Sequence, residues 1–298
     1  MNNGARQWFD QGYESFCGTF PRIAENIPYR PFYVCPQCLN AFPESALLAG
    51  WLTQEHVPPE SVGGKKIVLT CKNCNNTAGH STDADMRREA DILDFFGKRL
   101  AEIHATMATP SGKELPIRLS TSDGGYRICA VPKAAHPDAG KAVTTDLHRA
   151  ALPDGWQDFR INLRFEPFSP ARAEASWLRS AYLAFFAACG YRFAVRPELA
   201  GVRQRMSEPN TNAFTFRIVL PQPVAEPLLT VIKTPETFRS FAMIYGQHIV
   251  FLPLYGDTEL YSRLALHSTG NVELSSESSY GWPDRPLFLH DRPAAQSV

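Results

Sequence analysis

Two cysteine pairs constrain this chain more than any other feature of its sequence. Cys35 and Cys38 are separated by two residues, and so are Cys71 and Cys74. This spacing lets both thiolates of a pair face one ion, and two such pairs complete a tetrahedral zinc site. The gap between the pairs exceeds the ~15–20 residues of a simple four-cysteine zinc motif, so we expect a structural element inserted between them. A redox pair or a chance spacing is the alternative.

Composition favours a globular intracellular protein. Of 298 residues, 44% are hydrophobic and 20% are charged, which is ordinary for folded domains. The seven cysteines are an odd number, and the first residues lack the apolar core of a signal peptide, which weighs against a disulfide framework. No apolar run approaches the ~20 residues needed to span a bilayer. We therefore predict a cytoplasmic protein without a membrane segment, and a net charge of zero argues against nucleic-acid binding through bulk charge alone.

The pattern of apolar residues changes near Pro110-Ser111-Gly112, which predicts one domain over 1–109 and a second over 110–298. Within the first, three prolines suggest irregular structure over 1–34 rather than a long helix: Pro21, Pro28 and Pro31. Apolar residues recur at spacings of three and four over 75–104, which predicts helix there.

The second half alternates apolar and polar residues, which predicts strands. The segments 117–119 and 126–128 flank a glycine turn, and 241–245 and 248–252 flank another, so both pairs are hairpin candidates. Alternation also predicts strands over 159–165 and 214–220. Between these groups, residues 175–190 form an apolar stretch interrupted by Arg179, which predicts a buried helix that ends at Gly190. The second domain is therefore predicted to be α+β, with antiparallel strands and a buried helix.

The segment between and after the cysteine pairs, EHVPPESVGGKKIVLTCKNCNNTAGH over 55–80, resembles the core of HNH endonucleases, the ββα-metal nucleases. The shared features are an acidic residue and histidine, a proline and glycine loop, an apolar strand into the second CxxC pair, and CNN opening a helix. The resemblance covers about 35–95 and implies a zinc-stapled, treble-clef-like ββα module. The family usually has asparagine at the middle motif position, where this chain has Lys66. In the family, the asparagine orients the loop that carries the histidine. Its replacement by Lys66 therefore bears on activity rather than on the fold.

The resemblance implies specific roles for four residues. His56 would be the general base, because imidazole accepts a proton near neutral pH. Glu55 and Asn75 would bind one Mg²⁺ or Mn²⁺, since oxygen ligands suit hard cations. His80 would face the phosphate. Each has a structural alternative: His56 and His80 as structural histidines, Glu55 as a solvated strand-end carboxylate, and Asn75 as a helix cap.

These features together predict a metal-dependent endonuclease that hydrolyses DNA, with the second domain conferring specificity or binding a protein partner. A double-strand break would need two such sites, most simply in a homodimer. Restriction or antiviral defence is the setting that the family association suggests. Two alternatives stay open: a non-catalytic zinc-binding module that recognises nucleic acid or protein, and a nuclease effector that is silent until a partner or ligand activates it. Asp83 and Asp85 are further candidates for the metal site, or acids attracted to a helix N-terminus.

Overall fold

The computed structural model describes residues 3–78, 82–108, 114–122, 125–131, 162–210, 217–266 and 272–291, with a few positions between 138 and 148. Its internal contacts divide the chain into two compact units. The larger unit comprises Met1–Met86 with Pro170–Val298, and the smaller unit comprises Arg87–Ser169. This grouping does not follow the boundary predicted after residue 109, so the division into functional domains at that boundary stays a prediction.

A long helix opens the larger unit. The prediction of irregular structure over 1–34 is wrong for α1 (Asn3–Thr19), a helix of 17 residues. All three prolines follow its end, and Pro21 itself begins the short helix α2 (Pro21–Glu25). Phe9 and Phe16 are buried two turns apart on one face of α1. Gly12 lies between them, and a Cβ there would come within 2.5 Å of the Tyr33 ring, so glycine permits the close packing of this helix.

The cysteine-rich segment then forms two hairpins and a helix. The first hairpin pairs β1 (Phe32–Val34) with β2 (Ala41–Pro43), and α3 (Glu44–Leu48) follows. The second pairs β3 (Leu52–Val57) with β4 (Lys65–Cys71) across a loop that contains η1 (Glu60–Val62). The helices α4 (Lys72–Ala78) and α5 (Ala84–Phe96) come next. The predicted order of strand, strand and helix after the first cysteine pair is therefore present.

The second part of the larger unit is built around the predicted buried helix. Every residue of α7 (Pro170–Cys189) from Ala175 onward is buried, and the helix ends at Gly190, whose φ is +95°. Three short helices follow: α8 (Tyr191–Ala194), η4 (Pro197–Leu199) and α9 (Ala200–Ser207). The prediction of a buried helix that ends at Gly190 is therefore confirmed.

An antiparallel sheet of five strands in the order β13-β10-β11-β12-β9 completes the larger unit. Its strands are β9 (Arg217–Val219), β10 (Leu228–Thr234), β11 (Ser240–Tyr245), β12 (His248–Leu252) and β13 (Ser275–Ser279). The helix η5 (Glu236–Phe238) lies between β10 and β11 in the chain, and α10 (Leu260–Leu266) lies between β12 and β13. The hairpin predicted over 241–252 is confirmed, with Tyr245 opposite His248. Of the strand predicted over 214–220, residues 214–216 lie outside the described residues.

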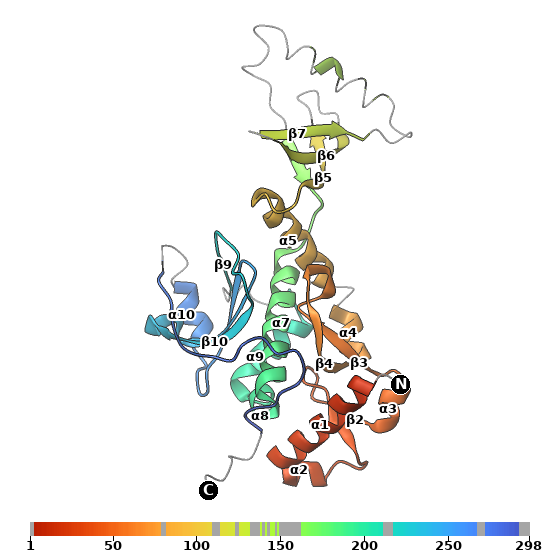
Figure 1. Cartoon of the computed structure of the whole chain (residues 1–298), viewed down its shortest axis with the longest axis vertical. Coiled ribbons are helices and arrows are strands. Elements are labelled where there is room, and N and C mark those ends of the chain that lie inside the picture. The colour runs from red at the N-terminus through yellow and green to blue at the C-terminus, as the bar shows by residue number, and fades with distance from the viewer. Residues whose placement is uncertain are drawn as a thin grey trace. The chain divides into compact units, whose positions relative to one another are not determined.

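Helix α7 lies between the β3–β4 hairpin and the five-stranded sheet, and it contacts β3 and β4 as well as β11 and β12 (Figure 1). One hydrophobic cluster includes Ile67 and Val68 of β4, Trp177 and Phe185 of α7, and Val250 of β12. The cysteine-rich module and the second half of the chain therefore share a core. The fold is α+β with antiparallel sheets, as predicted.

The smaller unit contains most of α5 and an antiparallel sheet in the order β7-β6-β5-β8. Its strands are β5 (Glu102–Ala108), β6 (Glu114–Ser122), β7 (Gly125–Ala130) and β8 (Asn162–Phe165). The predicted hairpin is confirmed, with Ser122 opposite Gly125. The helix predicted as far as residue 104 is wrong beyond Phe96, where α5 ends, and residues from Glu102 onward form β5. Ala105 and Met107 pair with Ile117 and Leu115, so alternation along β5 buries them against β6. Residues 159–161 of another predicted strand lie outside the described residues.

Candidate functional site

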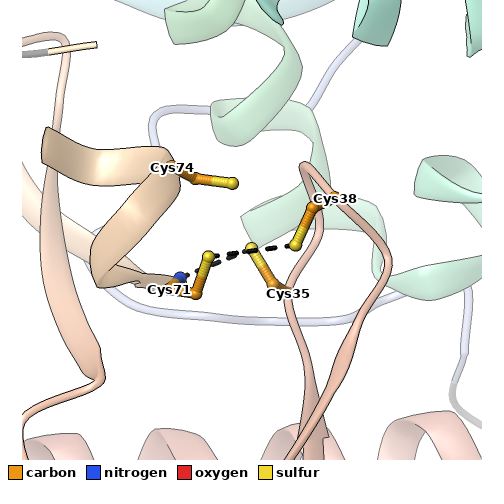
Figure 2. A group of neighbouring side chains, drawn as sticks. All are labelled: Cys35, Cys38, Cys71 and Cys74. Atoms are coloured by element: carbon orange, nitrogen blue, oxygen red, sulfur yellow. Dashed lines mark hydrogen bonds between the residues drawn. The ribbon is translucent and has the colours of Figure 1, made fainter. Parts of the chain in front are cut away.

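Four cysteine thiols converge between the two hairpins (Figure 2). Cys35 follows β1, and Cys38 lies in the turn that leads to β2, where Leu39 adopts a φ of +58°. Cys71 is the last residue of β4, and Cys74 lies in the first turn of α4. The first hairpin therefore supplies one pair, and the end of β4 together with the first turn of α4 supplies the other.

The geometry of this cluster fits a tetrahedral zinc ion. All four Sγ atoms lie within 4.8 Å of one another, and Cys38 Sγ is 3.8 Å from Cys71 Sγ. Zinc–sulfur bonds of ~2.3 Å in a tetrahedron place neighbouring sulfurs ~3.8 Å apart. The Cys71 backbone N–H donates to Cys35 Sγ at 3.4 Å, and hydrogen bonding with Cys35 lowers the pKa of Cys38 to about 7. A search of the described residues for three or more His, Cys, Asp or Glu side chains close enough to share a metal ion finds this four-cysteine cluster.

His56 stands near the end of β3 and is partly exposed. Its side chain is 27% exposed, and its Nε2 lies 3.7 Å from Glu60 Oε2, in the loop that follows. In the hairpin, His56 pairs with Lys66, the residue that departs from the family motif, and Lys66 is exposed. The imidazole is therefore accessible to solvent, and a carboxylate stands beside it.

The loop after His56 depends on Gly64. A Cβ at this position would come within 1.5 Å of the Pro58 carbonyl oxygen, so only glycine allows the two ends of the loop to meet. Gly63 beside it has a φ of +88° and donates its N–H to the Glu60 carbonyl. These contacts give a structural reason for the proline and glycine loop of the sequence, because they fix where β3 ends and hence where His56 lies.

Glu55 is buried and ion-paired. It is 3% exposed, its Oε1 lies 2.9 Å from Nη2 of Arg179 on α7, and its Oε2 accepts a hydrogen bond from Thr70 at 3.1 Å. Burial raises the pKa of Glu55 above its ordinary value, although the Arg179 charge opposes the shift. The alternative of a solvated strand-end carboxylate is therefore wrong.

Asn75 faces β3 from α4. Its Nδ2 donates to Thr53 Oγ1 at 3.0 Å, a bond that does not use the amide oxygen. Asn75 is the fourth residue of a helix that begins at Lys72, so it is not a helix cap. His80 lies outside the described residues.

Asp83 and Asp85 both contact α7 rather than a cluster of metal ligands. Asp83 Oδ1 accepts a hydrogen bond from Ser176 at 2.6 Å, and Asp83 Oδ2 lies 3.8 Å from Arg179 Nη1. Asp85 Oδ2 lies 2.6 Å from Arg172 Nε. Sequence reasoning did not assign Arg179 to the site. The sequence did offer one indication of its role, because Arg179 is the charged residue that interrupts the apolar helix predicted over 175–190.

The two metals suggested by the sequence differ in how well this structure fits them. The thiol cluster matches zinc in donor type, number and spacing. The residues that would hold a hard divalent ion are Glu55 and Asn75, but Arg179 and Thr70 already contact both oxygens of Glu55. Because Mg²⁺ usually keeps several waters, a carboxylate that is 3% exposed has little room for it while Arg179 stays in place.

Comparison with known families agrees with this architecture. The HNH endonuclease family model matches residues 35–91, a span that starts at Cys35 and includes both cysteine pairs, the β3–β4 hairpin and α4. Residues 35–91 therefore match an HNH endonuclease domain, and this similarity implies nuclease activity on a nucleic-acid substrate. The resemblance noted in the sequence is confirmed. No curated protein and no solved structure matches the chain.

Of the helices in the described parts of the chain, none combines the length and the apolar character needed to cross a membrane.

Proposed function

We propose that this chain is a metal-dependent HNH endonuclease that hydrolyses DNA phosphodiester bonds. The observation that carries the proposal is the match of residues 35–91 to the HNH family. The β3–β4 hairpin of that segment holds a partly exposed His56 and ends at the four-cysteine cluster. A rigid hairpin is suited to catalysis, because a general base must stand within hydrogen-bond reach of the water it deprotonates.

In this mechanism His56 takes the proton from the attacking water. Glu60, 3.7 Å from Nε2, would stabilise the imidazolium that results. Glu55 and Asn75 would hold a divalent ion once Arg179 leaves Glu55, and that ion would supply stabilisation of the charge that develops on the leaving 3′ oxygen. Zinc on Cys35, Cys38, Cys71 and Cys74 would keep the two hairpins together and take no part in the reaction. The products would be a 5′-phosphate and a 3′-hydroxyl.

A second candidate function is a nuclease effector that stays silent until a partner or ligand acts on it. The observation that favours it is the buried ion pair between Glu55 and Arg179, which engages a residue of the proposed site. A non-catalytic zinc-binding module is a third candidate. A role in restriction or antiviral defence, a homodimer, a protein partner at the C-terminal part of the chain and a cytoplasmic location stay predictions.

The test of the proposed function is plasmid cleavage by the zinc-loaded full chain with Mg²⁺ or Mn²⁺. Wild type should nick or linearise supercoiled DNA, EDTA should abolish cutting, and His56→Ala should be inactive. His104→Ala is the matched control, because His104 is exposed on β5 of the smaller unit and should be dispensable. Cutting by His56→Ala at the wild-type rate would refute His56 as the base. Parallel reactions with single-stranded DNA and RNA identify the substrate class.

A further inference from the structure

A polar stripe on α7 faces the HNH domain. Its residues stand at positions i, i+4 and i+7 of the helix, which lie on one face. Each contacts a different carboxylate in the part of the chain that runs from β3 to α5. The contacts are Arg179 with Glu55, Ser176 with Asp83, and Arg172 with Asp85. A helix outside the family-matched segment therefore neutralises or hydrogen-bonds three acidic residues inside it.

Burial distinguishes the inner contact from the outer one. Arg179 and Glu55 are 4% and 3% exposed, whereas the Arg172 side chain is 42% exposed beside a buried Asp85. A buried carboxylate without a counter-charge is costly, so Glu55 requires a cation close by. Arg179 supplies it, and the second nitrogen of its guanidinium, Nη1, lies 3.8 Å from Asp83.

We propose that Arg179 is the resident counter-charge of Glu55, and that it excludes a divalent ion from this carboxylate while α7 stays in its observed position. The inference rests on the proposed function, because it concerns the ion of that site. A guanidinium and a divalent ion both neutralise a carboxylate, and Glu55 offers almost no exposed surface to a second cation. The ion thus binds at Glu55 only when Arg179 withdraws.

The position of α7 suggests how withdrawal is controlled. The helix also contacts β11 and β12, and the Trp177 ring lies 3.8 Å from the His248 ring of β12, centre to centre. Trp177 is two residues from Arg179. A displacement of the five-stranded sheet would therefore move the helix that carries the arginine.

The test measures Mn²⁺ binding by electron paramagnetic resonance on the zinc-loaded full chain at pH 8. Arg179→Met keeps much of the apolar stem and removes the charge, so it should tighten Mn²⁺ binding by about tenfold or more. Adding Glu55→Gln to that variant should abolish the gain. Arg239→Met is the control, because Arg239 pairs with Glu236 at an exposed position of the same unit, and it should bind Mn²⁺ like wild type. Unchanged or weaker binding by Arg179→Met would overturn the inference and make Arg179 a supporting residue of the ion site.

A second measurement uses wild type and does not depend on the folding of a variant. The side-chain nitrogens of Arg179, followed by ¹⁵N NMR, should lose their paired signature when Mg²⁺ saturates the protein. Mg²⁺ saturation with an unchanged Arg179 signal would also overturn the inference. Plasmid cleavage distinguishes failure of this inference from failure of the proposed function. If the Arg179 tests fail but His56-dependent cutting persists, the nuclease function holds and only the role of Arg179 is refuted. If the protein neither cuts DNA nor binds Mn²⁺, both proposals are refuted.

Discussion

Arg179 on α7 lies 2.9 Å from the carboxylate of Glu55 on β3, so a residue of the second half of the chain completes the environment of a residue in the HNH domain. Both side chains are almost fully buried. The pair joins a hairpin and a helix that also share a hydrophobic cluster. The HNH domain of this protein is therefore not an independent module on a tether, and its stability and its activity should both respond to changes in α7.

The ion pair should be strongly coupled in stability. Arg179→Met or Glu55→Gln alone leaves its partner buried without a full counter-charge and should lower the free energy of unfolding by about 3–5 kcal/mol. The double variant should recover much of that loss, because no unpaired charge remains. Urea denaturation of the four proteins gives the coupling energy directly. Additive losses in the double variant would mean that the two residues act independently.

The cysteine cluster should be required for folding of the larger unit. Replacing Cys71 by serine removes one of four ligands and should release zinc, with loss of cooperative thermal unfolding, because structural zinc contributes about 10–16 kcal/mol of apparent binding energy in small domains. Metal analysis and circular dichroism check this. Cys129→Ser is the control, because Cys129 is exposed on β7 and lies outside the cluster. Retention of full zinc content by Cys71→Ser would contradict the four-cysteine site.

Gly64→Ala should impair the site without removing zinc. The added Cβ would collide with the Pro58 carbonyl, so the loop must shift and carry the end of β3 and His56 with it. We expect a fall in cleavage rate of about tenfold or more, since small misplacements of a catalytic group are costly. Gly201→Ala in α9 is the control, because a Cβ there has open space. A normal rate for Gly64→Ala would show that the loop does not position the histidine.

Stability should fall in mild acid partly through His248. Burial, and then the Arg217 charge, lower the pKa of His248 from 6.5 to about 3. The unfolded chain therefore binds this proton first, so stability is complete above pH 6.5 and declines as pH falls toward 3. The contribution of this one group reaches about 5 kcal/mol at most.

The measurement is the difference between wild type and His248→Gln in urea unfolding between pH 7.5 and pH 4. The variant should lose less stability on acidification, whereas His104→Gln, with an exposed side chain, should follow wild type. Parallel curves for wild type and His248→Gln would exclude the histidine as a cause of acid sensitivity.

Local patterns determined much of this protein. Two-residue cysteine spacing is a property of a single turn, so it predicted the four-thiol cluster, and alternation around glycine predicted the hairpins at Gly246 and after Ser122. The continuous apolar surface of 175–190 predicted a buried helix. The HNH resemblance predicted the β3–β4 hairpin from residues that are close in sequence, and the role of His56 stays a prediction. In each case the information lies within one or two neighbouring elements.

Tertiary structure decided the rest, because the deciding contacts join distant segments. Residues 102–104 fall at the end of the stretch whose apolar spacing predicts a helix, but pairing with β6 makes them part of a strand. Helix α1 forms where prolines nearby suggested none, since its aromatic face is buried against β1 and α8. Glu55 was recognisable as part of a motif, but its counter-charge was not. An ion pair depends on which side chains the packed core brings together, and α7 lies beside Glu55 because the two halves of the chain share that core.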